Sequence, residues 1–473
     1  IKRIILSHNY IFWTAFHIIL GIVSSLSPYG LIIWFYAVVG SSFFMVLSLK
    51  GIFPFIAFIT YLISFELLAR MSQTSPFIPY ELGKYLLCFM LILGVIKYGY
   101  KNYLGLILVL LLIPSIFFDL SGKVDSKTLV FNLMGPINVG LAVWFFYGKS
   151  ITKVQLIKLL RISLFPLIAV LFSTIFKTPS YDNLEFTLGA NFETSGGGGS
   201  NQVSTVLGLG VFICFIFLIN KWPITGFRIL DFFLFFLFGF QGLLTFSRGG
   251  IIGGVIGILI IFLFILMSGK SEKKRFKLPR LGKVFLIATI LSLITFQVVD
   301  NLTGGLIGLR YLGETQGTLA GTKEKSFDSI TTGRFSIFIE DLELWEENLV
   351  WGVGAGSSSF LREESQFYFS HVELSRLLAE HGVFGLIYFL ILIYLMSRLI
   401  LSKRPPMEKG ILFAFFIIAL YTTFHAAMRT YLTPLFIGLS LMDVRMVKHK
   451  PKTSKEVEIE VQKKTNQNFR PVL

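Results

Sequence analysis

Residues 245–277 read TFSRGGIIGGVIGILIIFLFILMSGKSEKKRFK and carry the plainest structural signal in the chain. No charged residue occurs from Gly249 to Gly269, and about 20 mostly apolar residues are enough to cross a bilayer as a helix. Arg248 precedes this run, and a basic cluster follows it at 270–277. Because Lys and Arg gather on the cytoplasmic side of membrane proteins, the stretch predicts a transmembrane helix whose Arg248 end faces outward.

The composition of the whole chain agrees with a membrane protein. Of its 473 residues, 54% are hydrophobic and 15% are charged, with a mean hydropathy of +0.73, whereas soluble domains carry about 25% charged residues. A formal charge of +16 would suggest nucleic-acid binding in a soluble protein. Here a basic inner face explains it, and we expect no nucleic-acid partner. Cys88 and Cys214 lie in apolar runs, so they are expected to be core residues and not part of a disulfide framework.

Apolar runs of similar length recur along the chain. We therefore expect an all-α polytopic membrane protein with about 12–14 transmembrane helices and one large outer loop that contains short helices. The first run is not followed by a small-residue cleavage site, so it is expected to be a span and not a cleaved signal peptide. The candidate spans lie near residues 10–26, 30–48, 51–70, 82–97, 103–119, 129–147, 155–176, 203–220, 227–246, 250–267, 282–299, 376–396, 410–427 and 431–445.

The distribution of basic residues predicts the orientation of these spans and a division into five parts. Alternate loops are rich in Lys and Arg and should be cytoplasmic, although Lys123 and Lys127 fall on the opposite side. The polar end of the chain is expected to be a mobile cytoplasmic tail. The expected parts are N-terminal transmembrane helices (1–176), central transmembrane helices with an outer glycine-rich loop (177–299), a large periplasmic loop (300–375), C-terminal transmembrane helices (376–446) and the tail (447–473).

The segment 300–375 is much longer than an ordinary connection between helices. It holds twelve acidic residues against five basic ones, and it is the one outer piece that is large enough to hold a site. Within it, residues 334–351 read RFSIFIEDLELWEENLVW, with apolar residues at three- and four-residue spacing. This pattern predicts an amphipathic helix that begins at Arg334 and either lies on the membrane surface or packs on top of the bundle.

Two glycine-rich stretches also lie in outer regions. Gly352-Val-Gly354-Ala-Gly356 lacks the strand-turn-helix context of a nucleotide loop, so a tight turn with close backbone approach is expected. The run of glycines between Ser195 and Ser200 is expected to be a flexible joint.

Ionisable residues are concentrated where the outer segment re-enters the membrane. His371, Glu373, Arg376, Glu380 and His381 are too many charges for a helix start that faces lipid, and such groups usually face a polar cavity or a partner. For His371, a functional and a structural role are equally compatible with this pattern.

Arginines at the outer ends of other spans also have two interpretations. Arg248 is either an interfacial anchor or an anion-binding residue. Ser247 and the glycine pair after Arg248 favour anion binding, since they would let a polar ligand approach the backbone. Arg429 is a weaker candidate of the same kind.

Taken in order, these motifs resemble the O-antigen ligase and polysaccharide polymerase superfamily. The resemblance covers about residues 195–430 and rests on SGGGGSNQVSTVLGLG (195–210), TFSRGG (245–250), Gly333-Arg334, the Trp-bearing helix, the Gly-x-Gly-x-Gly run, and His371 before LLAEHGVFGL (377–386). Members often have Asn-Pro before the glycine run and Asn after the loop His, whereas here Leu349 follows Asn348 and Val372 follows His371. These departures concern local contacts.

The resemblance implies an inverting, metal-independent glycosyltransferase without a cofactor, at the outer face of the cytoplasmic membrane. Its donor would be an undecaprenyl-diphosphate-linked glycan. Its acceptor would be lipid A–core or a similar surface acceptor for a ligase, or the next lipid-linked repeat unit for a polymerase. The order of the motifs favours a ligase. A polysaccharide flippase is a further alternative, but no internal repeat between the two halves supports it.

The expected site residues follow from this chemistry. Arg248 and Arg334 would bind the diphosphate, because a guanidinium donates a bidentate fork to phosphate, and His371 would serve as the base or orient the acceptor. No Asp-x-Asp pair or His/Cys cluster suggests a metal site. Further substrate-binding candidates are Ser247, Glu373, Arg376, Arg429, Asn201 and Gln202.

Overall fold

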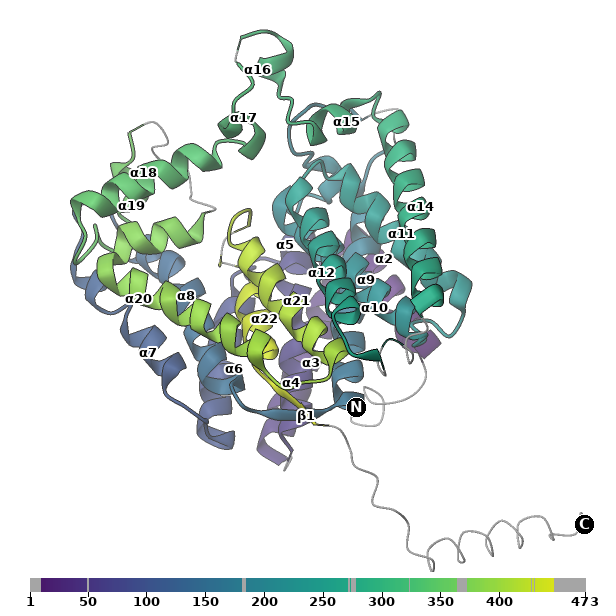
Figure 1. Ribbon diagram of the computed structural model, residues 1–473, viewed down its shortest axis with the longest axis horizontal. Helices are drawn as coiled ribbons and strands as arrows, with labels where there is room; N and C mark the ends of the chain where they lie inside the picture. Colours follow the sequence, from purple (N-terminus) through teal and green to yellow (C-terminus); the bar gives the residue numbers. More distant parts are fainter. Residues whose placement is uncertain are drawn as a thin grey trace, which may run out of the picture.

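A computed structural model describes residues 10–48, 51–180, 184–270, 273, 278–322, 324–363, 372–426, 428 and 430–445. Within these residues the regular structure is helical apart from two three-residue strands, β1 (Ser150–Thr152) and β2 (Asp443–Arg445), which pair in parallel. The predicted all-α class is therefore confirmed (Figure 1).

The first half of the chain forms helices close to the predicted apolar runs. Short 3-10 turns, η1 (Leu62–Ser64), η2 (Pro114–Phe117) and η4 (Glu193–Ser195), interrupt or follow them. The helices are α2 (Tyr10–Leu26), α3 (Pro28–Ser48), α4 (Ile52–Tyr61), α5 (Phe65–Met71), α6 (Leu82–Tyr98), α7 (Leu104–Leu110), α8 (Ser126–Phe146), α9 (Lys153–Lys177) and α10 (Ser200–Asn220).

The second half contains long helices on either side of a group of short ones. The long helices are α11 (Arg228–Leu244), α12 (Arg248–Leu266), α14 (Leu278–Leu302), α20 (Glu373–Leu401) and α21 (Pro406–Thr422). The others are α15 (Leu306–Tyr311), α16 (Gln316–Leu319), α17 (Phe327–Thr331), α18 (Arg334–Glu347), α19 (Ser358–Leu361) and α22 (Leu432–Ser440).

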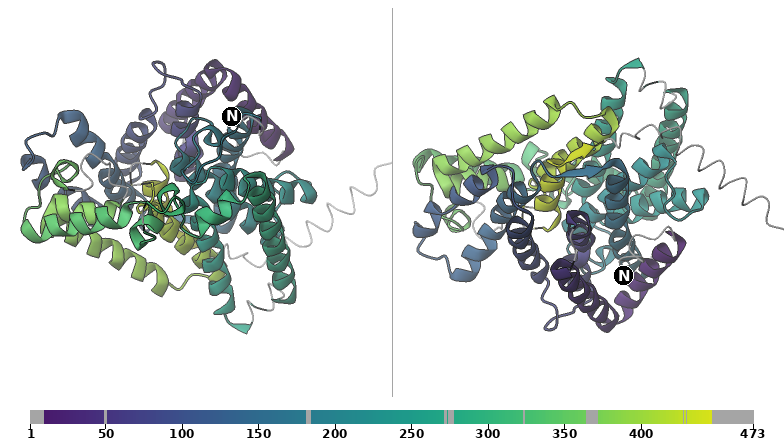
Figure 2. Two further views of the ribbon diagram at one scale, coloured as in Figure 1. Left: turned by 90° about the horizontal axis from the view of Figure 1, so that it is seen from above. Right: turned by 90° about the horizontal axis from the view of Figure 1, so that it is seen from below.

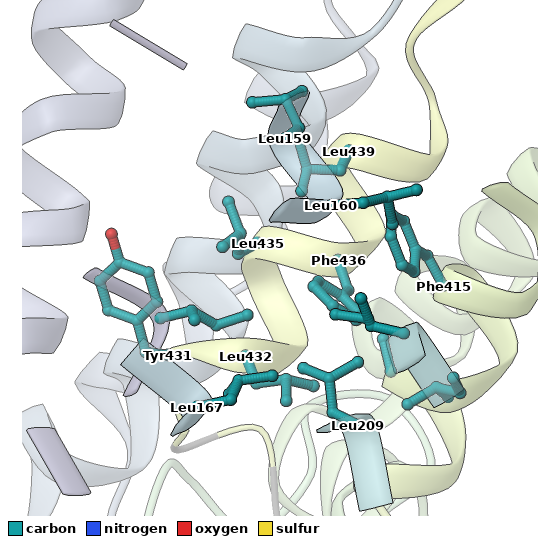
Figure 3. Close-up of a cluster of buried hydrophobic side chains, with 14 of the residues drawn as sticks. Leu159, Leu160, Leu167, Leu209, Phe415, Tyr431, Leu432, Leu435, Phe436 and Leu439 are labelled. Carbon is teal, nitrogen blue, oxygen red and sulfur yellow. The ribbon is translucent and has the colours of Figure 1, made fainter. Parts of the chain in front are cut away.

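The core forms around α10, whose side chains are all buried from Val203 to Leu218. This helix packs against α9, α11 and α12, and α12 packs in turn against α21. Figure 3 shows how the leucines of α9 meet Leu209 of α10, Phe415 of α21 and the short helix α22. Because all these positions are apolar and close together, the interior of the bundle is continuous from α9 to α22.

The predicted last span, residues 431–445, is wrong. Here the chain forms α22, which has nine residues and is buried along its whole length, followed by β2. Nine helical residues rise about 14 Å, whereas the hydrocarbon core is about 30 Å thick. The run is apolar because it fills the bundle interior, and a short apolar run cannot be told from a span by hydropathy alone.

The described helices are those of a polytopic membrane protein, as predicted. Among the described residues, seven helices are long and apolar enough to cross a membrane, and three further apolar helices are shorter. The seven are Ile52–Met71, Ser126–Phe146, Lys153–Lys177, Ser200–Asn220, Arg248–Leu266, Gly282–Leu302 and Glu373–Leu401. The prediction of 12–14 spans counts every apolar run, whereas these seven are the described helices of at least 18 residues.

The short helices α16 and α17 lie between two sides of the molecule, and α15 lies next to α14. In Figure 1 and in the view from above in Figure 2, α18 and α20 lie on one side, and α12 and α14 lie on the other. The predicted amphipathic helix is α18, and it packs against α20. Ile337 and Asp341 are its buried residues, whereas Phe335 and Ile339 remain exposed.

Helix α20 is bent at Gly382, whose backbone is not helical (φ 57°, ψ −133°). The bend leaves the carbonyls of Ala379 and Glu380 available to accept hydrogen bonds from the amides of Val353 and Gly354. The outer segment is thereby attached to the first part of α20.

Candidate functional site

The link between α11 and α12 presents Arg248. Phe246 has a φ of 55°, a left-handed conformation that a bulky residue rarely adopts. Its ring is buried and stacks on Phe186. The extended Ser247 follows, so Arg248 becomes the first residue of α12, where the helix dipole favours a negatively charged ligand.

Arg248 connects helix α12 to the segment 300–375, which was predicted to lie outside the membrane. Its Nη1 donates to the carbonyl of Arg310 at 2.8 Å, and its Nη2 donates to the carbonyl of Ile330 at 2.6 Å. The two acceptors lie in α15 and α17. The guanidinium is therefore held by backbone groups of the outer segment, which a simple interfacial anchor would not require.

Arg334 lies beside these contacts. Thr332 and Gly333 both have positive φ angles, 57° and 79°, and reverse the chain between α17 and α18. The Arg334 guanidinium donates to the Thr331 carbonyl at 2.9 Å and to the Thr332 hydroxyl. Thr331 follows Ile330, the acceptor of Arg248, so the structure brings the two predicted arginines together. Burial lowers the pKa of Arg334, and the positive charge of Arg248 lowers it further.

Arg310 is a third arginine at this place, and it was not among the predicted site residues. It is only 9% exposed, and its Nε lies 3.5 Å from the carbonyl of the strained Phe246. Burial, followed by the positive charges of Arg248 and Arg334, lowers the pKa of Arg310 to about 10. A lone Arg in GLIGLRYL has no local pattern that marks it, and only its position beside the other two reveals it.

The three residues Arg248, Arg310 and Arg334, here called the arginine cluster, have no acidic partner in the part of the chain that the structure describes. Partly buried cations that repel one another favour the binding of an anion. Because the cluster also lies at the N-terminus of α12, its charges and the helix dipole act in the same direction.

Asn201 and Ser247 meet next to this cluster, whereas Gln202 has a different partner. The Ser247 hydroxyl donates to Asn201 Oδ1 at 2.8 Å, and the Ser204 hydroxyl donates to the Ser247 carbonyl at 2.6 Å. These bonds join the starts of α10 and α12. Gln202 accepts a hydrogen bond from Arg70 at 3.3 Å.

The glycine pair after Arg248 has a packing role, which corrects the expectation that it admits a ligand. A β-carbon at Gly250 would lie 2.0 Å from the carbonyl carbon of Ser204, and one at Gly249 would lie 2.5 Å from the ring of His425. The missing side chains let α10 and the His425 ring approach α12. His425 itself is hydrogen-bonded to the Thr205 hydroxyl at 2.8 Å.

The glycine run between Ser195 and Ser200 is an ordered turn and not the expected flexible joint. The amides of Gly196, Gly197 and Gly198 all donate to carbonyls of residues 192–195. A β-carbon at Gly198 would lie 2.7 Å from the side chain of Met71. The run therefore packs against α5 and leads directly into α10.

Glu373 and Arg376, predicted to bind substrate, bind each other inside the bundle. Arg376 forms ion pairs with Glu373 and with Glu380, the second at 3.0 Å, and donates to Asn132 Oδ1 of α8 at 2.7 Å. All three charged residues are at most 2% exposed. These contacts indicate that they attach the first part of α20 to α8.

A second buried ion pair joins α18, the residue after α19, and α20. Arg362 Nε donates to Asp341 Oδ1 at 3.0 Å, and the Ser375 hydroxyl donates to Asp341 Oδ2 at 2.7 Å. Burial raises the pKa of Asp341 to about 6, although the neighbouring Arg362 opposes this. No sequence pattern marks this ion pair, because its two residues lie on separate elements.

The Gly352-Val-Gly354-Ala-Gly356 run is the predicted tight turn. All three glycines have positive φ angles of 71°, 98° and 89°. A β-carbon at Gly354 would lie 2.0 Å from the Phe118 carbonyl oxygen, and one at Gly352 would lie 2.5 Å from the carbonyl carbon of Glu380. The glycines thus permit close backbone contact with the residues before α8 and with α20.

Two predicted site residues, His371 and Arg429, lie outside the described residues. The next described residue after His371 is Val372, and the amide of Glu373 donates to the carbonyl of Thr423 at 3.1 Å. Another histidine of the cluster in sequence, His381, is buried at 2% exposure in α20.

Comparison with known protein families adds one match. Residues 232–390 match the family model described as O-antigen ligase. This range begins in α11, ends in α20, and includes all three residues of the arginine cluster. A comparison with curated proteins gave no match.

Proposed function

Because residues 232–390 identify this chain as a member of the O-antigen ligase superfamily, we propose that it transfers an undecaprenyl-diphosphate-linked glycan to an acceptor at the outer face of the cytoplasmic membrane. Membership makes it a multi-pass membrane glycosyltransferase of the ligase or polymerase type that acts on lipid-linked glycans. The observation that carries the proposal is the convergence of Arg248 and Arg334 on the adjacent carbonyls of residues 330 and 331.

In the proposed reaction, an acceptor hydroxyl attacks the anomeric carbon of the donor glycan. A new glycosidic C–O bond forms as the C–O bond to the diphosphate breaks, and the bonding electron pair leaves with the diphosphate oxygen. The acceptor proton passes to His371, the proposed base. Attack opposite the leaving group inverts the anomeric centre, and Arg248 and Arg334 stabilise the charge that grows on the diphosphate. No metal or other cofactor takes part in this proposal.

A ligase is the preferred form of this activity, with lipid A–core or a similar surface glycolipid as acceptor. The order of the Gly-Arg, Trp and His motifs within one outer segment supports that choice. A repeat-unit polymerase is the alternative with the same donor chemistry. The attachment of the outer segment to the arginine cluster favours chemistry at this end of the bundle over transport by a flippase.

The experiment that tests the function uses the purified full chain in detergent with a lipid-linked glycan donor and a lipid A–core acceptor. The proposal expects glycosylated acceptor and released lipid diphosphate without nucleotide, added metal or an ion gradient. Vesicle-reconstituted protein that moves the donor across the bilayer but forms no glycosidic bond would identify a transporter instead.

A deletion strain separates the ligase from the polymerase. Loss of a ligase leaves polymeric glycan on the lipid carrier, whereas loss of a polymerase leaves single repeat units on the final acceptor. We expect the first pattern, measured on glycans extracted from the carrier and from the cell surface.

Replacement of Arg334 or His371 by Ala is expected to abolish surface glycan in cells that lack the native protein. Arg334→Ala removes a cation from the diphosphate site, and His371→Ala removes the proposed base, a change that typically lowers rates by about 10²–10⁴-fold. Glycan would be followed on gels beside immunoblots of the membrane fraction. Arg228→Ala, which changes an exposed arginine at the first position of α11, is the matched control. Normal glycan at normal protein level would show that the substituted residue has no such role.

A further inference from the structure

We propose that Arg310 is a third phosphate-binding side chain, and that the complete arginine cluster selects a diphosphate over a monophosphate. This inference rests on the proposed function, since it concerns the leaving group of the same donor. It assigns a binding role to a residue that neither the sequence motifs nor the proposed mechanism uses.

Arg310 lies next to Arg248. Its backbone carbonyl accepts from Arg248 Nη1 at 2.8 Å, while its own Nε lies 3.5 Å from the carbonyl of Phe246, two residues before Arg248. Arg310 therefore contacts the TFSRGG turn at two points. The Arg310 side chain and the Arg248 guanidinium therefore both lie at this turn.

The terminal nitrogens of Arg310 are available to bind a ligand. Within the described residues neither Nη1 nor Nη2 of Arg310 donates to a protein acceptor, although the residue is only 9% exposed. A guanidinium has five N–H donors, and an anion is the ligand that satisfies them best. Arg334 adds a further donor, because its Nε is buried without a partner in the described part of the chain.

The charge of the leaving group increases during the proposed reaction. A glycan-linked diphosphate is a double diester with about two negative charges, and its release creates a terminal phosphate, giving about three. Two guanidiniums match the bound donor, whereas three match the released diphosphate. The third cation therefore stabilises the state in which the glycosidic bond is broken more than the state before it, which is the requirement for catalysis.

The phosphate groups also explain the expected selectivity. At neutral pH a free monophosphate carries about two negative charges and pyrophosphate about three, so the monophosphate gains less from a third cation. A diphosphate presents two phosphate groups, and each guanidinium can form charge-assisted hydrogen bonds with one of them. Such bonds contribute about 1.5–3 kcal/mol each, which corresponds to about 10- to 150-fold in affinity.

Binding of inorganic pyrophosphate and inorganic phosphate to the purified full chain tests this inference. Wild type is expected to bind pyrophosphate in competition with the donor and to prefer it to phosphate. Arg310→Gln keeps a donor that can reach Phe246 but loses the charge. It should bind pyrophosphate about 10- to 100-fold more weakly, while phosphate binding changes little. Arg310→Lys, which keeps the charge, should retain more of the preference, and Arg228→Gln should behave as wild type.

The outcomes separate this inference from the proposed function. Equal pyrophosphate affinity of wild type and Arg310→Gln would overturn the role of Arg310 and leave the transferase proposal intact. Failure of wild type to bind pyrophosphate and to transfer glycan would overturn both. If Arg310→Gln does not fold, Arg310→Lys decides: a folded Lys variant without any pyrophosphate preference contradicts a charge-based role, whereas a retained preference supports it.

Discussion

Replacement of Arg248 by Ala is expected to lower the rate of glycan transfer by about 10³-fold, a loss as large as that from removing a donor that stabilises transition-state charge in other enzymes. The expectation is this large because Arg248 has two tasks. Its charge faces the proposed diphosphate at the N-terminus of α12, and its two Nη groups hold the carbonyls of Arg310 and Ile330. The substitution removes one cation and also releases the chain that carries the other two.

The Lys variant separates these tasks. A lysine keeps the charge but has one compact ammonium, which cannot replace a planar fork that reaches two carbonyls. Arg248→Lys is therefore expected to remain well below wild type, with activity closer to Arg248→Ala. Initial rates of the purified chain measure both, and the thermal unfolding midpoint shows whether the fold persists. Arg228→Ala is again the control, and an Arg248→Ala variant with more than a tenth of wild-type activity would remove Arg248 from the site.

The partners of Arg248 show why sequence patterns predict only part of such a site. Its position at the end of an apolar run is local information, and it led to the correct prediction of a helix and of Arg248 at its start. Its two acceptors lie 62 and 82 residues further along the chain. No periodicity links positions that far apart, so Arg310 was missed and the pairing with Arg334 needed the fold.

The same distinction explains the errors. The hydropathy of residues 431–445 predicts that they are shielded from water. Lipid and the interior of a helix bundle both provide such shielding. Here α22 lies in the interior. A glycine in the sequence indicates either a flexible backbone or a position where a side chain would prevent close contact between helices. At Gly250 and Gly198 the reason is close contact, because a β-carbon would collide with atoms of Ser204 and Met71 respectively.

Replacement of Asp341 by Ala is expected to destabilise the protein by about 3–5 kcal/mol, because it breaks the buried ion pair that Asp341 forms with Arg362. Both side chains of this ion pair are fully buried, and the Ser375 hydroxyl also loses the shorter of its two hydrogen bonds, keeping the one to the Val372 carbonyl. The free energy of unfolding would be measured in detergent with a chemical denaturant. Glu343→Ala, at an exposed position of the same helix, is the control and should change stability by no more than about 0.5 kcal/mol.

A double variant distinguishes the loss of the ion pair from a general effect at this position. Asp341→Leu with Arg362→Met replaces both charges by apolar groups of similar volume, which is often neutral or stabilising. It should therefore be more stable than Asp341→Ala alone. If the double variant were as unstable as the sum of the single variants, the two side chains would not act as a pair.

Asp341 also connects stability to the proposed chemistry. Its two partners, Arg362 and Ser375, lie on either side of His371 in the sequence, and they bond to opposite oxygens of one carboxylate. We therefore expect Asp341→Ala to lose transfer activity at temperatures where it is still folded. The double variant should recover stability more fully than activity, since it lacks the carboxylate that joins Arg362 to Ser375. Parallel measurement of kcat and of the unfolding midpoint tests this. A loss of activity that follows the unfolded fraction alone would limit Asp341 to a purely structural role.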